Sequence, residues 1–259
     1  MAALLGIGVL VTRPEQQAMP LCRLLAAEGA VSFPFPAIDI KPLAERRDLI
    51  ARVGQLEHFD LIVFVSANAV RFGAHLLDQK RDLPLAAVGP ATSRALNQAG
   101  YRVAVVPADG VDSEALLAHP RLQHLVGRRV LIIKGSGGRE LLATALAERG
   151  AIVELADVYE RVPATHSDAE FAELERQFAA DRIQVITATS AELGASLLRM
   201  ATPALRAYFE RVHWLVASAR VAESLGKSGL RAPLVPAASA EDHDLVAALI
   251  RWRSSVSGA

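Results

Sequence analysis

The stretch LADVYERVP, residues 155–163, guides the interpretation of the whole chain. It follows an apolar run rich in Val and Ile and leads into the polar sequence ATHSDAEFAEL. Within it, Tyr159 stands between the carboxylate of Asp157 and an adjacent Glu–Arg pair. A second proline-bracketed extended run, PFPAIDIKP, spans residues 34–42. We interpret the two runs as antiparallel connecting strands between two lobes, with a cleft beside them.

The composition is that of a globular protein. The 259 residues suit one large or two small domains, and 52% of them are apolar while 22% are charged. The 28 Lys and Arg match the 28 Asp and Glu, which argues against a nucleic-acid binder that relies on bulk charge. A single cysteine, Cys22, excludes an internal disulfide and fits a reducing cytosol.

Membrane and export signals are not expected. The apolar start lacks the basic region of a signal peptide, and no apolar run reaches the ~20 residues that span a bilayer. We therefore expect a soluble cytoplasmic protein with neither nucleic acid nor membrane as a partner.

Short β-branched runs alternate with longer amphipathic segments, which predicts parallel sheets with helices on both faces. Strands are predicted over residues 8–12, 31–35, 59–65, 85–88 and 103–106. Helices are predicted over residues 15–28, 43–56, 67–77, 91–98 and 112–118. Ser66 is placed as a helix N-cap, and Gly89-Pro90 as a turn.

The pattern then restarts, which indicates an internal duplication. Three segments match in the same order. GVLVTRPEQQAMPLCRLLAAEGAV, from Gly8, aligns with RVLIIKGSGGRELLATALAERGAI, from Arg129. LIVFVSANAV, from Leu61, aligns with VITATSAELG, from Val185, and VGPATSRALNQAGYRVAVVP, from Val88, aligns with ASARVAESLGKSGLRAPLVP, from Ala217. Each repeat has the size of one α/β domain. The boundary lies either at Gly127, between the repeats, or at two crossings after residue 36 and at about residue 163; the residues alone leave both open.

Candidate ligand anchors are the residues that directly follow strands, because ligands of open α/β sheets bind at the carboxyl ends of the strands. Hydroxyls and backbone N–H groups at helix starts, with a few cations, suit carboxylates or phosphates. The candidates are Thr12, Arg13, Ser66, Ala67, Asn68, Gly89, Pro90, Ala91, Thr92, Lys134, Gly135, Ser136, Gly137, Gly138, Thr189, Ser190, Ser218, Ala219 and Arg220.

Each anchor also has a purely structural interpretation. Ser66, Ser190 and Ser218 suit helix N-caps, and Arg13 and Lys134 suit solvated charges at strand ends. The KGSGGRE segment is neither a P-loop nor GxGxxG, and is consistent with a flexible turn. Because the anchors recur in both halves, where they would face each other across a cleft, we favour a binding role.

Several catalytic patterns are absent from the sequence. The seven histidines form no HxxH or HExxH pair, and neither CxxC nor Gly-x-Ser-x-Gly occurs, so we expect no metal site and no serine nucleophile. Asp39, Asp157 and Glu160 are not positioned as an acid–base pair, and Tyr159 also suits an ordinary packing aromatic. The residues point to a cleft that binds an anion.

An ordered set of short motifs resembles the uroporphyrinogen-III synthase family over nearly the full length. The matching pieces are VLVTRP near the start, VFVSANAV at 63–70, AAVGPATSRAL at 86–96, KGSGGRELL followed by ERGA, VYERVP, and VASARVAESL near the end. The resemblance implies two α/β lobes joined by a two-stranded ribbon, with the active site in the cleft between them. It assigns residues 1–36 and 163–259 to the first lobe, 37–162 to the second, and about 35–41 and 156–163 to the ribbon.

The resemblance also implies the chemistry. The family closes linear hydroxymethylbilane to uroporphyrinogen III, with inversion of the last pyrrole ring and loss of water, and uses no cofactor. The substrate is a linear tetrapyrrole with eight carboxylates. We expect a monomer that makes transient contact with the preceding enzyme of the pathway.

Site residues are carried over motif by motif. Tyr159 matches the ribbon tyrosine of the family, which assists departure of the substrate hydroxyl as a general acid or hydrogen-bond donor. Lys134 stands where many relatives carry arginine, so the charge is kept without bidentate binding, and ITATSAEL departs from its motif. The expected substrate-binding residues are Arg13, Ser66, Asn68, Gly89, Thr92, Lys134, Gly135, Ser136, Gly137, Ser190, Ser218 and Arg220.

Two other functions are compatible with a duplicated α/β chain. One is a two-lobed sensor that binds a small ligand without catalysis, in which Tyr159 has no special role. The other is a glycosyltransferase-like enzyme that uses a nucleotide sugar, which calls for a longer chain and a clearer phosphate loop.

Overall fold

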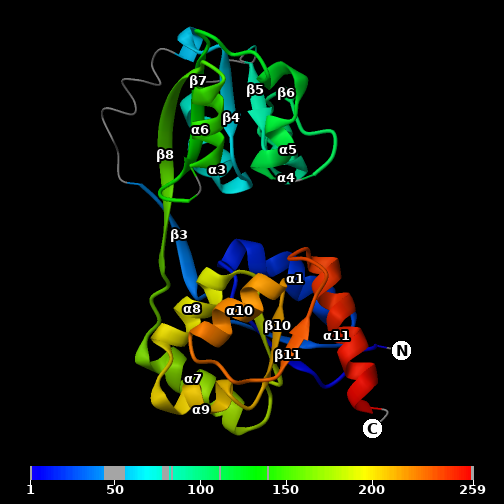
Figure 1. Cartoon of the computed structure of the whole chain (residues 1–259). Helices are drawn as coiled ribbons and strands as arrows, with labels where there is room; N and C mark the ends of the chain where they lie inside the picture. Colours follow the sequence, from blue (N-terminus) through cyan, green and yellow to red (C-terminus); the bar gives the residue numbers. More distant parts are fainter. Residues whose placement is uncertain are drawn as a thin grey trace. The chain divides into compact units, whose positions relative to one another are not determined.

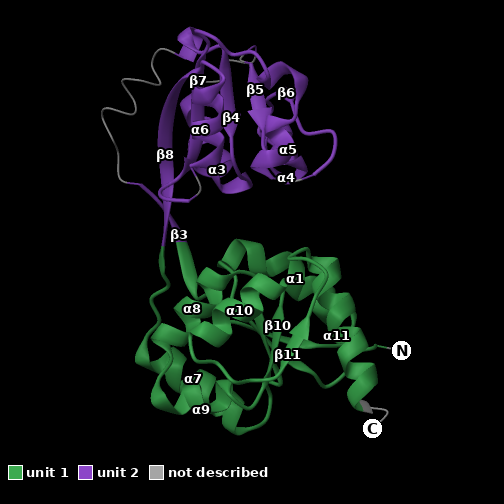
Figure 2. Ribbon diagram, viewed as in Figure 1, with its two compact units in different colours: residues 1–39, 162–259 green, residues 40–161 purple. Residues whose placement is uncertain are grey.

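The computed structural model describes residues 2–43, 56–77, 82, 84–110, 112–138 and 140–257 (Figure 1). The helix predicted over residues 43–56 falls mostly on residues 44–55, outside this described part. The chain divides into two compact units: unit 1 comprises Met1–Asp39 and Val162–Ala259, and unit 2 comprises Ile40–Arg161 (Figure 2). It therefore crosses between the units after residues 39 and 161, where the sequence placed the crossings after 36 and 162.

Unit 1 is built on a five-stranded parallel sheet with the order β11-β10-β9-β1-β2. The strands are β1 (Gly8–Val11), β2 (Val31–Pro34), β9 (Val185–Ala188), β10 (His213–Val216) and β11 (Leu234–Pro236). The helices are α1 (Glu15–Ala27), α7 (Asp168–Ala179), α8 (Ala191–Met200), α9 (Pro203–Phe209), α10 (Ala219–Lys227) and α11 (Asp242–Ser257). Successive residues of β1 belong to different apolar clusters, Val9 with α1 and α11 and Leu10 with α7 to α10, so helices cover both faces.

The second sheet has six strands in the order β3-β8-β7-β4-β5-β6. They are β3 (Ile38–Pro42), β4 (Leu61–Phe64), β5 (Leu85–Ala87), β6 (Val103–Val105), β7 (Arg129–Gly135) and β8 (Ile152–Pro163). The helices of unit 2 are α3 (Ala67–Gly73), α4 (Pro90–Gln98), α5 (Ser113–Leu117) and α6 (Leu141–Glu148), with 3₁₀ turns η1 (Leu56–His58), η2 (Ala74–Leu77) and η3 (Pro120–Leu122). Two apolar clusters again cover the two faces, one with α3 and α4 and one with α5 and α6.

The two chain crossings, β3 and β8, are neighbouring strands of the second sheet. The backbone N–H of Leu43 donates to the carbonyl of Val158 at 3.2 Å, and that of Ala164 donates to the carbonyl of Ala37 at 3.3 Å. Residue numbers rise along one strand as they fall along the other, so the pair is antiparallel, as the two proline-bracketed runs predicted.

The duplication is confirmed in strand order and in register. If β7, β8, β4, β5 and β6 are taken as the counterparts of β1, β2, β9, β10 and β11, both sheets have the same order. In unit 1 Gly8 pairs with Val31, and in unit 2 their sequence-aligned counterparts Arg129 and Ile152 pair. Val9 with Val185 corresponds in the same way to Val130 with Leu61. The two units are therefore copies of one design, with the chain entering each copy at a different strand.

Helix starts follow the caps that the sequence predicts. The hydroxyls of Ser66, Ser190 and Ser218 accept the backbone N–H three residues further on at 3.0, 3.2 and 3.3 Å, which begins α3, α8 and α10. The predicted turn at Gly89-Pro90 is wrong, because Gly89 caps α4 and Pro90 is its first residue. Proline suits that position, since the N–H it lacks would have no partner in the first turn of a helix.

In the described part of the chain, no helix has the length and hydropathy needed to cross a bilayer.

Candidate functional site

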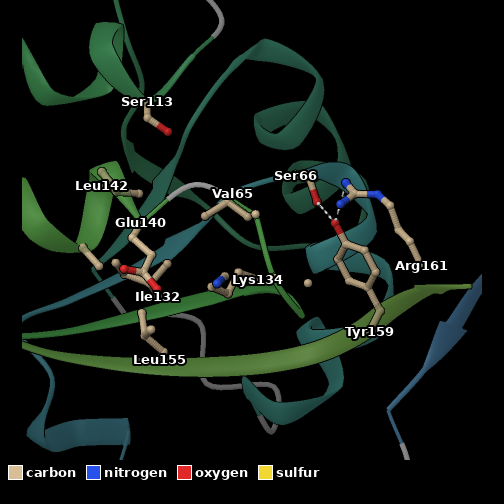
Figure 3. A pocket seen from close by; sticks show the side chains of 14 residues that line it. Val65, Ser66, Ser113, Ile132, Lys134, Glu140, Leu142, Leu155, Tyr159 and Arg161 are labelled. Carbon is tan, nitrogen blue, oxygen red and sulfur yellow. Dashed lines mark hydrogen bonds between the residues drawn. The ribbon is translucent and has the colours of Figure 1, made fainter. Parts of the chain in front are cut away.

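A pocket of about 200 Å³ lies in unit 2 beside the carboxyl ends of β4 and β7 (Figure 3). Five of the residues expected to be catalytic or to bind substrate line it: Ser66, Lys134, Gly135, Gly137 and Tyr159. The rest of its wall comes from Val65, Ser113, Ile132, Gly138, Glu140, Leu142, Ala143, Leu155 and Arg161. Its wall thus combines apolar side chains with polar and charged ones at the carboxyl ends of the strands, where ligands of α/β proteins bind.

Tyr159 places its hydroxyl among polar partners while its ring is buried. The residue is 2% exposed, and its ring centroid lies 5.8 Å from that of Phe72. Its Oη lies 3.2 Å from Ser66 Oγ, and Arg161 Nη2 donates to it at 3.4 Å. The Arg161 guanidinium also lies 5.6 Å from the centroid of the tyrosine ring. Figure 3 shows the three side chains converging on the phenol oxygen.

A β-bulge in β8 orients Tyr159. Lys134 pairs with Asp157 and Gly135 pairs with Tyr159, so Val158 is an extra residue with no partner in β7. The extra residue reverses the side-chain alternation, and Tyr159 joins the cluster that contains Ala156 and Val158. In a regular strand Tyr159 would point to the opposite face of the sheet. The bulge therefore decides where the hydroxyl lies.

Gly135 makes room for the tyrosine ring. A Cβ at this position would lie 2.5 Å from Tyr159 Cζ and 2.9 Å from its Oη, closer than real Cβ contacts. Gly135 was predicted as a substrate anchor from its place after a strand. The geometry gives it a packing reason that needs no ligand.

Lys134 carries the cation that the sequence predicted at this strand end. Its Nζ lies 3.8 Å from Asp157 Oδ1, and its side chain is 15% exposed. That oxygen of Asp157 is buried and has no hydrogen-bond partner. At this distance the ion pair is too long for a hydrogen bond, so the ammonium can still donate to a further partner and Asp157 Oδ1 can still accept from one.

The other predicted residues of unit 2 lie outside the lining of this pocket. Gly89 is the buried cap of α4, and Thr92, in its first turn, is 4% exposed. Asn68 is half-buried at the start of α3. Ser136 is exposed, and its backbone N–H donates to the carbonyl of Tyr159 at 2.7 Å. Their assignment to the substrate stays a prediction.

Four predicted residues belong to unit 1. Ser190 and Ser218 cap α8 and α10, and Arg220 is exposed in the first turn of α10. Arg13, by contrast, is 9% exposed. The expectation of a site in a cleft between the lobes stays a prediction.

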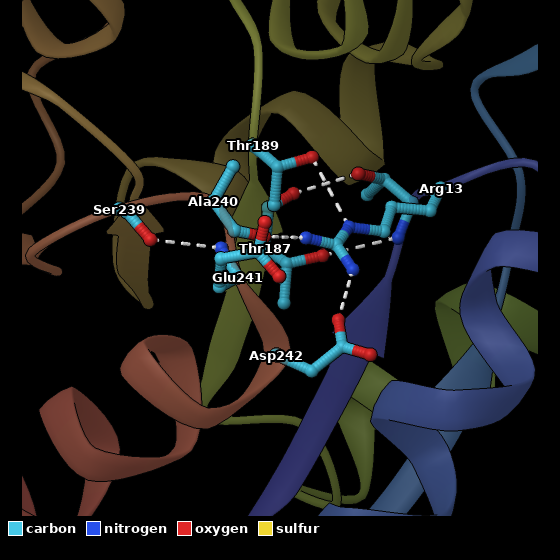
Figure 4. Close-up of polar contacts among 8 residues, drawn as sticks. Arg13, Thr187, Thr189, Ser239, Ala240, Glu241 and Asp242 are labelled. Atoms are coloured by element: carbon cyan, nitrogen blue, oxygen red, sulfur yellow. Dashed lines mark hydrogen bonds and ion pairs between the residues drawn. The ribbon is translucent and has the colours of Figure 1, made fainter. Parts of the chain in front are cut away.

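Arg13 is held by internal partners (Figure 4). Its Nη1 pairs with the carboxylate of Asp242, its Nη2 donates to the carbonyl of Ala240, and its Nε donates to Thr189 Oγ1 at 3.3 Å. These contacts join the end of β1 to the start of α11. The predicted role of Arg13 in substrate binding would require this network to open.

Three residues of the pocket wall were not predicted as site residues from the sequence: Ser113, Glu140 and Arg161. Arg161 carried a signal, because residues two apart on a strand share a face and Tyr159 had already been selected. Ser113 begins α5, far along the chain from the ends of β4 and β7, and only the fold brings it to the pocket. Within the described ranges, no cluster of His, Cys, Asp and Glu is arranged to hold a metal ion.

Known proteins resemble this chain over most of its length. The HEM4 family model, described as uroporphyrinogen-III synthase HemD, matches residues 20–246. The uroporphyrinogen-III synthase of Escherichia coli strain K12 is 33% identical over 215 residues, which is 81% of this chain and 84% of the relative. The enzyme of Salmonella typhimurium is 35% identical over the same shares.

Solved structures share the fold. The uroporphyrinogen-III synthetase of Helicobacter pylori superposes with a TM-score of 0.63 at 13% identity, over 95% of this chain and 99% of that one. A mutant uroporphyrinogen III synthase of Thermus thermophilus gives 0.61 at 20% identity, over 98% and 100%. At these identities the likeness establishes the α/β architecture with two helix-flanked sheets.

Proposed function

The chain belongs to the uroporphyrinogen-III synthase family, hydro-lyases of tetrapyrrole biosynthesis, and we propose that it closes linear hydroxymethylbilane to uroporphyrinogen III. The proposed reaction removes the terminal hydroxyl as water and inverts the last pyrrole ring. The observation that carries the proposal is the Tyr159 hydroxyl, which is presented to a pocket between Ser66 and Arg161.

The hydrogen bonds around Tyr159 suit a proton donor. Arg161 donates to the phenol oxygen. Ser66 Oγ already accepts the N–H of Ala69, so its own proton can be donated to the same oxygen. With two donors directed at Oη, the phenol proton is left for an acceptor in the pocket. The substrate hydroxyl is that acceptor in our proposal.

The chemical step follows from this arrangement. As the C–O bond of the hydroxymethyl group breaks, its electron pair leaves with oxygen, and the Tyr159 proton converts the departing hydroxide to water. The remaining tetrapyrrole is an electrophilic azafulvenium cation. Ring closure then releases one proton from the attacking pyrrole carbon, which returns the product to neutrality and restores the Tyr159 phenol. The Arg161 cation stabilises the negative charge that develops on the phenol oxygen. No covalent nucleophile is needed.

The pocket takes only part of the substrate. Its volume of about 200 Å³ is below the ~300–1,000 Å³ of pockets that enclose a whole small ligand. The rest of the tetrapyrrole must therefore be held by other surfaces. Because ring closure depends on how the flexible chain is folded, orientation contributes more than any single side chain. The eight carboxylates of the substrate are the groups by which it is held.

The test is to supply the purified protein with freshly prepared hydroxymethylbilane and to separate the oxidised porphyrin isomers by chromatography. Uncatalysed closure gives isomer I, and the proposal predicts predominantly isomer III. Isomer I alone from a folded protein contradicts it. The expectations of a monomer, of a cytoplasmic location and of transient contact with the enzyme that supplies the bilane stay predictions.

A further inference from the structure

The residues that enclose Arg13 in unit 1 have counterparts in unit 2. Lys134 is the counterpart of Arg13 because the ungapped alignment of the two repeats pairs them; Lys134 lies at the carboxyl end of β7, and Arg13 lies just beyond the end of β1. Ser113 is the counterpart of Asp242, because α5 and α11 begin at these residues after the corresponding strands β6 and β11. Three residues further on, Leu116 and Leu245 are both fully buried, which supports the same alignment.

The third counterpart is Val65, which precedes the cap Ser66 as Thr189 precedes the cap Ser190. In unit 1 Arg13 contacts both Thr189 and Asp242. In unit 2, Lys134, Val65 and Ser113 line the pocket that contains Tyr159. The open pocket of unit 2 is thus the position that unit 1 fills with a buried arginine and its carboxylate.

The two copies differ in which group supplies the negative charge beside the cation at this position. In unit 1 the anion is a side chain, Asp242, and the site is closed (Figure 4). In unit 2 a serine replaces that aspartate, and the cation borders an open cavity (Figure 3). We infer that a substrate carboxylate binds at Lys134 in unit 2, in the place that the Asp242 side chain takes in unit 1. This inference rests on the proposed function, which supplies an octacarboxylate as the ligand.

The Lys134 ammonium is suited to bind a carboxylate. In the part of the chain that the structure describes, its ammonium has no hydrogen bond and only the 3.8 Å pair with Asp157. Val65, Ile132 and Leu142 line the same pocket and keep water from part of its wall, which strengthens a charge-assisted hydrogen bond. The Ser113 hydroxyl provides a second donor on the opposite wall.

The balance of charge makes Ser113 a sensitive position. Lys134 and Arg161 contribute two positive charges at the pocket, and Asp157 and Glu140 contribute two negative ones. The pocket does not attract an anion by net charge, so recognition depends on local donors. A carboxylate built in at position 113, as unit 1 has it, would make the pocket net negative and compete for Lys134.

The test compares Ser113→Asp with Ser113→Asn, which has nearly the same size and no charge. The readouts are KM and kcat for hydroxymethylbilane and the Kd of uroporphyrin III, followed by fluorescence. We expect Ser113→Asp to raise KM and Kd at least tenfold above the Ser113→Asn values. Equal KM and Kd values for the two variants would overturn the inference.

A second pair keeps the test decisive if Ser113→Asp does not fold. Lys134→Met is expected to raise the Kd of uroporphyrin III at least tenfold, whereas Lys134→Arg, which restores the residue type of unit 1, keeps it within threefold. Equal affinity in both variants contradicts a carboxylate at this position. The wild-type isomer assay separates the two claims: isomer III with no effect of these substitutions refutes the carboxylate site alone, and isomer I alone refutes the proposed function.

Discussion

At the scale of single residues, the position of Tyr159 depends on a neighbour without a side chain. A methyl group at Gly135 would overlap the phenol ring, because the ideal Cβ lies 2.5 Å from Cζ. We expect Gly135→Ala to displace the ring, to lower kcat more than tenfold and to cost about 1–3 kcal/mol of stability, as overpacking does. Steady-state kinetics and urea unfolding measure both effects.

A matched control for this substitution is Gly226→Ala. A Cβ at Gly226, near the end of α10, meets nothing within 4 Å, and alanine favours helix more than glycine does. Stability should stay the same or rise slightly, and kcat should not change. Wild-type kcat in Gly135→Ala would contradict the requirement for close approach.

Arg161 is predicted to support Tyr159 through its charge. Its guanidinium donates to the phenol oxygen at 3.4 Å but is exposed, so solvent weakens the interaction. We expect Arg161→Gln to lower kcat by about three- to tenfold, equivalent to about 0.7–1.4 kcal/mol. Arg161→Lys should recover part of the loss. Identical kcat values for the two variants would argue against a role of the charge.

His213 makes stability depend on pH. Burial beside Trp252 lowers the pKa of its imidazole below the usual 6.5. At pH values between the lowered pKa of the folded state and 6.5, His213 is protonated in the unfolded chain but neutral in the folded protein. Lowering the pH below about 6.5 therefore favours the unfolded chain, and the free energy of unfolding decreases. We expect urea unfolding at pH 7.5 and 5.5 to differ less for His213→Gln than for wild type. An unchanged difference would show that other groups cause the dependence.

At the scale of elements, the sequence predicted most strands and helix starts but not the bulge that positions the Tyr159 hydroxyl. Serine caps and apolar runs are local signals, so Ser66 and β4 could be predicted from neighbouring residues. The bulge at Val158 depends on the hydrogen-bond register between β7 and β8. The segment VYERVP contains no local sequence signal that predicts this register. The pairing of Arg13 with Asp242 joins residues 229 positions apart, and no local sequence pattern predicts it.

That pairing ties β1 to α11 and carries a prediction of its own. Asp242→Asn removes the carboxylate and leaves the nearly buried Arg13 guanidinium without its counter-charge. Because the two side chains are 10% and 23% exposed, we expect a loss of about 2–3 kcal/mol, somewhat below the value for a fully buried pair. The free energy of unfolding in urea measures it. Loss below 0.5 kcal/mol would mean that water replaces the carboxylate at little cost.

At the scale of the whole molecule, duplication explains both the fold and the difference between its halves. The sequence predicted the repeat because three segments align without a gap inside any of them, and the strand registers of both sheets follow that alignment. It did not predict that the position filled by Asp242 in unit 1 corresponds to an open pocket in unit 2, because Asp242 and its counterpart Ser113 lie outside the aligned segments. At this position the two copies therefore differ: the site is closed by a side-chain ion pair in unit 1 and borders a pocket in unit 2.

The measurement that tests the central claim most directly is the porphyrin isomer ratio and rate obtained from hydroxymethylbilane with wild type and Tyr159→Phe side by side. The Phe variant keeps the ring and removes the hydroxyl between Ser66 and Arg161. The account predicts isomer III from both proteins, with kcat about 10²-fold lower for the variant, the lower end of what general-acid catalysis contributes. Isomer I from wild type, an unchanged kcat in the variant, or complete loss of activity in a well-folded variant would contradict it.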